Sequence, residues 1–558
     1  MALKTLAELL KESTNAYLSS LTSKNVSPTD VQNGIYTKMV EKISIENEGM
    51  PKGSKYTIPK NLAPAQIAEV LMYFYHIIKI PFAGLNADPQ SDVIAIYQDE
   101  GRDEGLYSTD EDVIYKTAVQ YNYTLTNHEL KEIMSYLRIL TKRSIKTLNP
   151  DLIPVNNGIF NYKEKKLLPF SPKFIFIAKS RVDYNEAAEN VVIEDHDEPW
   201  DLESWMESLS DDPEIVNVLW EIVGAVVRPH VTWNKTAWLY SDKGNNGKGT
   251  LCSFMRELCG PRTYASIPLD QFGEQFALEP LVNANVILVD ENDVGTYIDK
   301  AAKLKALITG DVFQINRKNK PIIDYQFNGF MVQCLNGFPK VKDTSDSFYR
   351  RQLFIPMQKN FEGKEKKYIK DDYLHRKEVL EYALKKVLNT NFYTLSEPEV
   401  SKNLLLEYKQ YNDPIRDFFF DVIPYTRWDK LPYDFLYELF KAWFIEKTPN
   451  GKIVGQKDFT KRIGAIVDAR PDFEDCKQFR VADLENIPEP MISKYNIIAF
   501  SDKKYLGADE NKRNRPKFPR DRYRGIKYLG NPSDKILIAD GIIPPPITKT
   551  VAKDDTDE

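Results

Sequence analysis

The chain has 558 residues, 42% hydrophobic and 28% charged, with a formal net charge of −6. This length suffices for about three to four domains of ~150 residues, and the composition is typical of globular proteins. The negative charge excludes binding to nucleic acid through overall charge alone. Any DNA contact therefore depends on local basic patches, or on subunits that gather charge in a shared channel.

Cysteine and histidine usage limits the chemistry further. The four cysteines form no CxxC pair and the five histidines are scattered, which argues against structural zinc and a disulfide framework. A reducing, cytosolic compartment fits this pattern best. The N-terminal segment MALKTLAELLKES is charged throughout, so no secretory signal is predicted. No apolar run approaches the ~20 residues that span a bilayer, so no membrane contact is expected.

The first 90 residues are predicted to be mainly helical. Leu3, Leu6, Leu9 and Leu10 recur at helical spacing and predict a helix whose apolar face meets the core or another subunit. A second helix is predicted over residues 64–80, where AQIAEVLMYFYHII is densely apolar.

Residues 91–205 predict a mixed α+β region. VIAIYQDEG indicates a strand and a turn, and helical signals follow over residues 110–142. The Asn-Gly pair in VNNGIFNYKEKKLLPFSP predicts a β-hairpin. A long helical region is then predicted over residues 202–227, where apolar positions keep a helical period.

The stretch SDKGNNGKGTL follows the apolar strand signal TAWLYS and precedes a helix with Leu251, Phe254, Met255 and Leu258 on one face. Gly260 is the predicted end of that helix. Strand, glycine-rich loop and helix is the context that a phosphate-binding loop requires. A structural glycine-rich turn is the alternative for the loop taken alone.

In such a loop, backbone N–H groups and the helix N-terminus surround a phosphate, and glycines allow the close approach. The predicted nucleotide-binding residues are Gly244, Asn245, Asn246, Gly247, Lys248, Gly249 and Thr250. Lys248 is expected to reach the β- and γ-phosphates. Gly249 occupies the position where a hydroxyl usually binds Mg²⁺, so Thr250 is predicted to supply that hydroxyl instead.

Three further patterns predict partners for the loop. ANVILVDEND is a buried strand signal ending in Asp290, the expected Mg²⁺ ligand, and Glu291, expected to polarise the attacking water. FNGFMVQCLNGFP is another strand ending in Asn336, which would orient the γ-phosphate or the water, although Asn-Gly is also a common turn. DSFYRRQLFIP presents Arg350 and Arg351, either of which could neutralise charge on a neighbouring subunit's nucleotide. Solvated acids and surface arginines are the alternatives.

Basic residues gather in three places. Arg317, Lys318 and Lys320 lie at the tip of a predicted hairpin, and Lys457, Lys461 and Arg462 lie on the polar side of a predicted helix that follows another helix and a turn. That pair of helices resembles a winged-helix DNA-binding unit, and a plain helical pair fits equally well. Residues 512–527 contain eight Lys or Arg with Phe518 and Tyr523 between them, which fits a flexible basic arm or a solvated linker. The acidic end, residues 553–558, is predicted to be disordered.

In combination, GNNGKGT, VILVDEN, CLNGFP and FYRRQLFIP resemble the helicase core of superfamily III, in particular the helicases of phage and plasmid primase proteins and poxvirus primase-helicases. Related replication helicases occur on staphylococcal phages and pathogenicity islands. The resemblance covers roughly residues 90 to 470. It implies an AAA+-like P-loop NTPase core within a multidomain α/β chain, and a ring, usually a hexamer, that hydrolyses ATP at subunit interfaces. The matched roles fall on Lys248, Asp290, Glu291, Asn336 and Arg350 or Arg351.

The implied domains are a helical region at 1–90, an α+β domain at 91–205, the core at 206–385, a winged-helix-like domain at 386–478 and a basic extension with an acidic tail at 479–558. In the resembled family, a hairpin at the position of Arg317, Lys318 and Lys320 grips DNA in the channel of the ring.

The resemblance implies an ATP- and Mg²⁺-dependent replicative helicase that moves 3′ to 5′ on single-stranded or forked DNA in a bacterial host cytosol, for a phage or mobile element. Two alternatives stay open. One is a replication initiator that binds origin DNA and uses ATP as a switch. The other is a helicase-primase, although residues 1–200 carry no convincing second carboxylate set, so a separate primase partner is expected if priming occurs.

Overall fold

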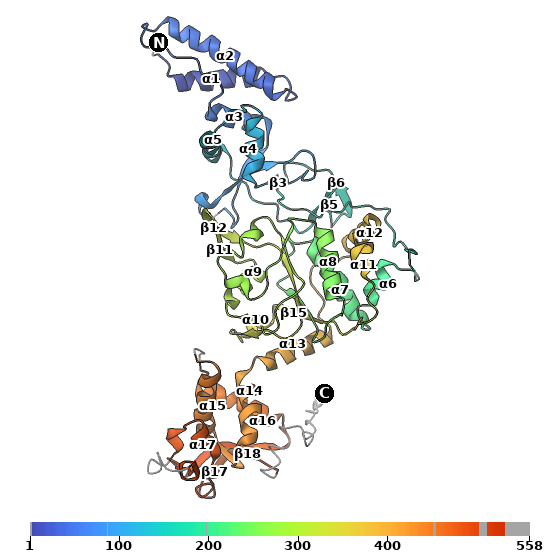
Figure 1. Cartoon of the computed structure of the whole chain (residues 1–558), viewed down its shortest axis with the longest axis vertical. Helices are drawn as coiled ribbons and strands as arrows, with labels where there is room; N and C mark the ends of the chain where they lie inside the picture. Colours follow the sequence, from blue (N-terminus) through green and yellow to red (C-terminus); the bar gives the residue numbers. More distant parts are fainter. Residues whose placement is uncertain (1–2, 86, 197, 450–452, 502–509, 531–558) are drawn as a thin grey trace, which may run out of the picture. The chain divides into compact units, whose positions relative to one another are not determined.

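A computed structural model of the chain describes residues 3–85, 87–196, 198–449, 453–501 and 510–530. They form two units, Met1–Leu406 and Glu407–Glu558, and together make a mixed α/β, multidomain protein (Figure 1). The predicted acidic end lies outside the described residues, as does part of the predicted turn at residues 448–451.

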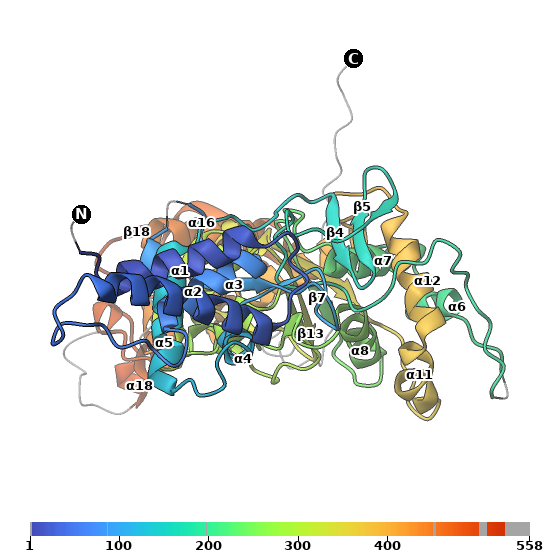
Figure 2. The same cartoon turned by 90° about the horizontal axis from the view of Figure 1, so that it is seen from above.

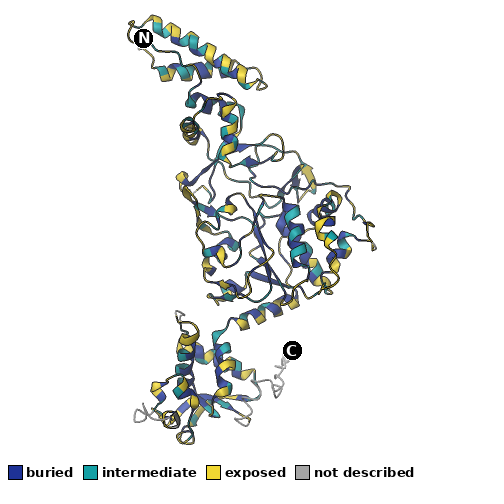
Figure 3. Cartoon of the chain, viewed as in Figure 1, coloured by how far each residue is buried: buried dark blue, intermediate teal, exposed yellow. Residues whose placement is uncertain are grey.

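A five-stranded parallel sheet lies at the centre of the first unit. Its order is β15-β7-β13-β9-β8, and every neighbouring pair is parallel. The strands are β7 (Thr236–Tyr240), β8 (Tyr264–Ala265), β9 (Val286–Val289), β13 (Phe330–Leu335) and β15 (Gln352–Pro356). Every residue of β9 and β13 is buried, as expected for a sheet covered on both faces, and Figure 3 shows the central strands in the buried colour. The strands predicted within TAWLYS, ANVILVDEND and FNGFMVQCLNGFP are confirmed as β7, β9 and β13.

Helices α7, α8 and α12 pack together beside this sheet (Figures 1 and 2) and share one hydrophobic core with it. The helices of this region are α6 (Leu202–Glu207), α7 (Pro213–Val227), α8 (Lys248–Cys259), α11 (Lys367–Asp371) and α12 (Lys377–Leu388). The helical region predicted over residues 202–227 is present as two helices, α6 and α7. Asp212 caps a new helix by accepting from the Glu214 N–H, and Pro213 occupies the first helical position, so the chain forms two helices.

Helix α8 ends as predicted and begins two residues before the predicted segment TLCSFMREL. It starts at Lys248, after Gly247 adopts a left-handed φ of 85°. It ends before Gly260, whose φ of 77° is one that side chains rarely adopt.

A hairpin and several short elements complete the core region. The hairpin joins β11 (Val312–Arg317) to β12 (Lys320–Gln326) in antiparallel register. The other elements are β10 (Tyr297–Ile298), α9 (Ala301–Thr309), β14 (Lys340–Val341), α10 (Asp346–Tyr349) and the 3₁₀ turns Gln271–Gly273, Glu279–Val282 and Tyr373–His375. Helix α13 (Glu399–Tyr411) contains the boundary between the two units.

The N-terminal part of the first unit has its own helical core. Its elements are α1 (Leu6–Ser20), α2 (Pro28–Glu48), α3 (Pro64–Phe74), β1 (Ile77–Ile80), a 3₁₀ turn (Pro89–Ser91), β2 (Val93–Tyr97), β3 (Tyr107–Ser108), α4 (Glu111–Val119) and α5 (Asn127–Leu140). The helix predicted to Ile80 is too long, because the chain becomes extended at Tyr75 and Ile77–Ile80 pairs with β2. The predicted Asn-Gly hairpin is confirmed as β4 (Leu152–Val155) and β5 (Gly158–Asn161), followed by β6 (Lys166–Leu168).

The hydrophobic cores divide the chain differently from the predicted domains. One core joins residues from Leu9 to Leu137, another joins residues from Ile153 to Leu395, and a third joins residues from Ile415 to Tyr528. The predicted limits at 90/91, 205/206, 385/386 and 478/479 each fall inside one of these cores. The domain limits implied by the resemblance stay a prediction, since a hydrophobic core can be shared by neighbouring domains.

The second unit combines helices with a three-stranded sheet. Along the chain it contains α14 (Pro414–Val422), β16 (Lys430–Pro432), α15 (Tyr433–Lys447), α16 (Gln456–Asp468), β17 (Phe473–Arg480), α17 (Pro490–Lys494), α18 (Glu510–Arg513) and β18 (Arg522–Tyr528), with 3₁₀ turns at Ile423–Tyr425 and Ile498–Phe500. Its strand order is β16-β18-β17. The basic segment at 512–527 is therefore neither an arm nor a linker throughout, because Arg522–Tyr528 is the central strand of this sheet.

Leu288 gives a direct measure of how strongly the central sheet stabilises the first unit. Its side chain is 0% exposed in β9. We expect Leu288→Ala to lower the free energy of unfolding by about 3 kcal/mol, because it removes apolar contacts and leaves a cavity. Denaturant titration measures the change, and Leu85→Ala, at a side chain that is 52% exposed, is the control. Equal losses of stability in the two variants would contradict the placement of Leu288 in the buried central sheet.

Candidate functional site

The loop between β7 and α8 lies at the carboxyl end of the sheet, where the strand order reverses. β7 lies between β15 and β13, and the next strand along the chain, β8, is at the far edge. Ligands of open α/β sheets bind at such a reversal, outside the carboxyl ends of the strands. The loop is therefore placed where a ligand is expected.

The loop backbone is held in an unusual conformation by its own asparagines. Asn245 has a left-handed φ of 51° and its side chain donates to Glu365 at 3.0 Å. Asn246 is 3% exposed and its side chain donates to the Lys243 carbonyl at 2.6 Å. A Cβ at Gly244 or Gly249 would meet no heavy atom within 4 Å, so both positions border open space. Such a loop can receive a ligand against its backbone.

Lys248 is the central group of the site. Its side chain is 5% exposed, and its Nζ has no hydrogen-bond partner within the described part of the chain. Burial lowers the pKa of this ammonium group, against the weaker opposing effects of Cys334 and Asp242. A buried ammonium group without a partner is costly unless an anion binds it, so its environment fits a phosphate.

Asp290, the predicted metal ligand, pairs with an arginine that the sequence did not single out. Arg256 of α8 donates to the two carboxylate oxygens at 2.8 and 3.1 Å. This contact holds the pKa of Asp290 below its usual range. The Arg256 guanidinium also lies 5.6 Å from the centre of the Tyr264 ring. Arg256 therefore favours the ionised form of Asp290 and fixes the orientation of its carboxylate. A cation that binds Asp290 has to compete with Arg256.

Thr250 does not share the face of α8 that meets Asp290. Successive helical residues are about 100° apart, so Gly249 and Arg256 point within about 20° of each other, whereas Thr250 points about 120° away from Arg256. Thr250 instead lines a pocket with residues of α6 and the α11 region. The expectation that Thr250 replaces the missing Mg²⁺ hydroxyl stays a prediction, and this geometry argues against it, because the one-residue shift rotates the Thr250 side chain away from Asp290.

Glu291 and Asn336 follow neighbouring strands at the same edge of the sheet. β13 pairs with both β9 and β7, and Leu335 is in register with Tyr240, the last residue of β7. Glu291 is exposed and Asn336 is half-buried. The strands therefore bring Lys248, Asp290, Glu291 and Asn336 to one edge, as the sequence predicted.

Two buried amides that the sequence analysis missed fix the end of β9. Asn292 is 3% exposed, donates to Gln333 at 2.9 Å and to the Cys334 carbonyl at 3.0 Å, and accepts from the Leu269 N–H at 2.9 Å. Gln333 donates to the Ile267 carbonyl at 3.1 Å. These bonds tie β9 to β13 just beyond Asp290 and Glu291. The sequence did offer one signal, because Gln333 is the polar residue in the otherwise apolar strand sequence FMVQCL.

A pocket of about 640 Å³ opens beside the loop. It is bordered by Asn245, Gly247 and Thr250 on the loop side, by Trp205 and Leu209 next to α6, and by Phe361 and Ile369 near α11. This volume is in the range of ~300–1,000 Å³ for small-ligand sites. Its apolar walls next to a phosphate-type loop can hold the ring system of a nucleotide.

Arg350 and Arg351 precede β15 and therefore lie at the amino end of the sheet. Gln352 pairs with Thr236, the first residue of β7, while the loop follows the last residue. Five residues at roughly 3.3 Å each separate the two ends. Arg350 is exposed and makes no side-chain ion pair within the described ranges, whereas Arg351 is half-buried and donates to the Ser347 carbonyl and to its hydroxyl. Only Arg350 is free to meet another molecule.

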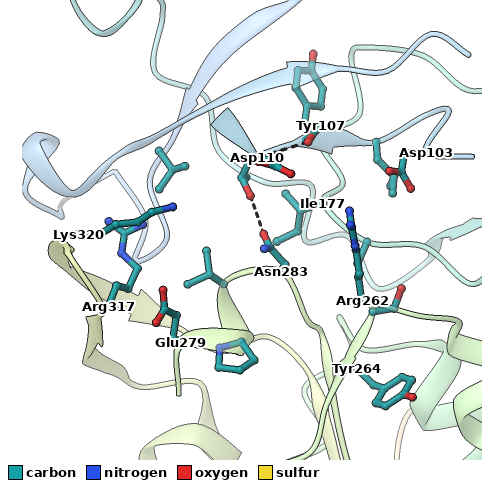
Figure 4. Close-up of a pocket in the computed structure, with 18 of the residues that line it drawn as sticks. Asp103, Tyr107, Asp110, Ile177, Arg262, Tyr264, Glu279, Asn283, Arg317 and Lys320 are labelled. Atoms are coloured by element: carbon teal, nitrogen blue, oxygen red, sulfur yellow. Dashed lines mark hydrogen bonds between the residues drawn. The ribbon is translucent and has the colours of Figure 1, made fainter. Parts of the chain in front are cut away.

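The basic hairpin residues are placed against the rest of the first unit. Arg317 donates from Nε and Nη2 to the Pro321 carbonyl at 3.1 and 3.0 Å, and the Lys318 N–H donates to Glu279 at 3.2 Å. Arg317 and Lys320 line a pocket that also receives residues following β2 (Figure 4). Of the predicted tip, the Lys318 and Lys320 side chains are exposed and Arg317 is half-buried.

In the second unit, Lys457 and Lys461 are exposed on α16, while Arg462 lies 3.6 Å from Asp413. Phe459, Ile463 and Val467 form the buried face of the same helix. The predicted basic face of this helix is therefore present.

The donor set fits a Mg²⁺-nucleotide. Mg²⁺ usually keeps several waters and takes one or two protein carboxylates together with substrate phosphates. Asp290 is the available carboxylate, and Lys248, whose Nζ has no partner among the described residues, can bind the phosphates. Among the described residues, no group of three or more His, Cys, Asp or Glu side chains could hold a metal on its own. The helices of those same residues include none that is both long and apolar enough to cross a membrane.

Comparisons with known families match three separate segments. Residues 100–211 match the family described as D5 N terminal like, residues 239–351 match a family of unknown function (DUF5906), and residues 410–492 match the family described as Poxvirus D5 protein-like. D5-like segments therefore lie on both sides of the segment with the phosphate-type loop. No curated protein is significantly similar to the chain in sequence.

Solved structures of the NrS-1 C terminal region are similar at low identity. One, described as its A form apo structure, is 14% identical with a TM-score of 0.38, covering 84% of this chain and all of the other. A second, also an A form apo structure, is 13% identical with a TM-score of 0.40, covering 83% of this chain and 99% of the other. At these values, neither fold nor function transfers from that protein to this chain.

Proposed function

We propose that the chain is an ATP-dependent DNA helicase of the D5-like, superfamily III type, which assembles as a ring and moves 3′ to 5′ on single-stranded DNA during replication of a phage or mobile element in the cytosol of its bacterial host. The observation that carries the proposal is the buried, partnerless Nζ of Lys248 at the base of a phosphate-type loop. The D5-like segments on either side support a role in replication.

Different residues of the site bind the nucleotide, bind Mg²⁺ and activate the attacking water. The loop N–H groups and Lys248 bind the phosphates, and the pocket beside Thr250 receives the base. Mg²⁺, when bound through Asp290, supplies neutralisation of phosphate charge. Glu291 orients the attacking water and accepts its proton, and Asn336 positions the water or the γ-phosphate. Asn292 and Gln333 keep the end of β9 in place.

The positions of the arginines support a ring. Arg350 lies at the opposite end of the sheet from its own loop, so it is suited to a neighbouring subunit's nucleotide. A head-to-tail interface that places Arg350 against the next loop closes into a ring, with a homo-hexamer as the expected form. The exposed Lys318 and Lys320 of each subunit would add positive charge to the channel.

The second unit supplies a second DNA contact. Its order of helix, strand, two helices and strand, followed after the short helices α17 and α18 by the strand β18, supports the winged-helix-like arrangement, with α16 carrying Lys457 and Lys461 to the DNA. This basic helix also favours the second candidate, an initiator that binds origin DNA and uses ATP as a switch. The helicase-primase alternative would need priming residues supplied by another polypeptide or by another part of the chain.

Lys248→Ala tests the proposal. We expect ATP hydrolysis to fall by about 10²-fold or more, because a charge-assisted contact with the reacting phosphates is lost, and unwinding to stop. Duplex and single-strand binding should stay within about threefold, because the second unit is unchanged. A variant that hydrolyses ATP and unwinds DNA like the unaltered chain would refute the motor; retained origin binding with no unwinding by either protein would favour the initiator.

Gly249→Ser tests the assignment of the missing Mg²⁺ hydroxyl. The added side chain has open space and shares the face of α8 that meets Asp290. We expect the Mg²⁺ concentration for half-maximal hydrolysis to fall by roughly tenfold, because a direct metal ligand is added. Thr250→Val is the comparison, and it should leave the Mg²⁺ dependence unchanged. If Thr250→Val instead raises the Mg²⁺ concentration needed for hydrolysis, then Thr250 lies close enough to Asp290 to bind the ion, and the placement of Gly249 rather than Thr250 on that face is wrong.

A further inference from the structure

A second pocket in the first unit is separate from the phosphate loop. It has a volume of about 420 Å³, and its lining includes none of residues 241–250. The turn after β2, the segment after α8, the 3₁₀ turn Glu279–Val282 and the hairpin β11/β12 all contribute to it, as Figure 4 shows. Its volume lies in the range of ~300–1,000 Å³ for small-ligand sites.

The acidic groups of this pocket already have partners. Asp103 pairs with Arg181 at 2.6 Å, Asp110 accepts from the Asp112 N–H at the start of α4 at 3.1 Å, and Glu279 accepts from the Lys318 N–H at 3.2 Å. Arg181 balances the charge of Asp103, the N-terminus of α4 favours that of Asp110, and the charge of Glu279 acts on Arg317. None of them is paired with the remaining cations of the pocket.

Of those cations, Arg317 is influenced by the nearby charge of Glu279, whereas Arg262 and Lys320 have no charged partner among the residues that the structure describes. Arg262 and Lys320 are exposed, and neither side chain has an ion pair or hydrogen bond among the residues the structure describes. Arg317 uses Nε and Nη2 on the Pro321 carbonyl, which leaves Nη1 as a donor. Figure 4 places Arg317 and Lys320 on one side of the pocket and Arg262 on the other.

The position of Arg262 is set by the backbone. Its φ of 70° is a left-handed conformation that residues other than glycine seldom adopt. Arg262 lies between the end of α8 and β8, and Thr263, the next residue, is anchored by donating to the Lys179 carbonyl at 3.2 Å. The turn therefore holds Arg262 at the pocket at the cost of backbone strain.

Uncharged groups complete the lining. The Thr109 hydroxyl donates to Oδ1 of the Asn283 side chain at 2.6 Å, which leaves the Asn283 side-chain NH₂ group as a further donor. The half-buried Tyr264 ring offers an aromatic surface. We infer that this pocket is a second phosphate-binding site, in which Arg262, Arg317 and Lys320 bind the phosphate group of a nucleotide or of a nucleic-acid strand. Guanidinium forks match phosphate oxygens in geometry and charge. The inference does not depend on ATP hydrolysis.

Binding measured in the full chain carrying Lys248→Ala tests this site, because the phosphate loop is then weakened. The probes are ATP and a thymidine tetranucleotide, which is too short to bridge distant basic patches. Arg262→Gln with Lys320→Gln is compared with Lys52→Gln and Lys131→Gln, two exposed lysines away from the pocket. Both double variants remove two positive charges, so only a local contact distinguishes them.

We expect the pocket variant to bind at least one probe about 10- to 100-fold more weakly than the control variant does. Loss for the tetranucleotide alone identifies a strand as the source of the phosphate, and loss for ATP alone identifies a free nucleotide. Arg262→Lys with Lys320→Arg keeps both charges and should retain most of the binding, which separates charge loss from misfolding. Equal affinities of the pocket and control variants for both probes would overturn the inference.

Discussion

Glu291→Gln is expected to lower ATP hydrolysis by about 10²- to 10⁴-fold, because the amide cannot accept a proton from the attacking water. Glu291 follows β9 directly after Asp290 and is exposed at the carboxyl edge of the sheet. The glutamine keeps the size and hydrogen-bonding capacity of the side chain. ATP binding should therefore stay within a few-fold, and a steady-state phosphate-release assay combined with nucleotide titration measures both quantities.

Asp293→Asn is the matched control for this substitution. Asp293 is also exposed, lies two residues beyond Glu291 and loses the same charge when changed. It should hydrolyse ATP at about the rate of the unaltered chain, since a surface charge change alone has a small effect. A comparable loss in both variants would show that the field of the acidic segment, rather than Glu291 as a base, controls the rate.

Arg350→Ala is the second substitution with a large expected effect, on the order of a 10³-fold loss of hydrolysis. The proposed reason is that Arg350 neutralises charge on the nucleotide of the neighbouring subunit. Arg351→Ala should have a smaller effect, because Arg351 is held by Ser347 within its own α10. ATP binding by isolated subunits should be unchanged in either variant.

Mixing two inactive variants tests action between subunits. In a ring assembled from equal amounts of Lys248→Ala and Arg350→Ala chains, roughly a quarter of the interfaces combine an intact loop with an intact Arg350. Hydrolysis should therefore partly recover on mixing. No recovery, in rings shown by mass measurement to be mixed, would mean that Arg350 acts within its own chain or has no catalytic role.

The parts of the site that depend on local sequence could be predicted. The strand before the loop, the helix after the loop and the end of that helix at Gly260 follow from apolar periodicity and glycine conformations. The meeting of Asp290, Glu291 and Asn336 follows because parallel strands present their carboxyl ends at one edge.

The parts of the site that depend on the direction of a side chain around a helix, or on partners distant in the sequence, could not be predicted. A shift of one residue between Gly249 and Thr250 turns the hydroxyl by about 100°, which a motif match does not register. The pairing of Arg256 with Asp290 joins residues 34 positions apart. The sheet of the second unit brings Arg522–Tyr528 next to β17 across a long intervening segment, so a basic, proline-containing stretch was mistaken for an arm or a linker.

Unwinding of a forked DNA by the purified full chain is the most direct measurement of the central claim. The substrate carries a fluorophore and a quencher on its two strands, with a free 3′ tail, a free 5′ tail or both. We predict strand separation that requires ATP and Mg²⁺, needs the 3′ tail and is absent with Lys248→Ala. DNA that is bound but not separated, with ATP hydrolysis unaffected by Lys248→Ala, would contradict the account.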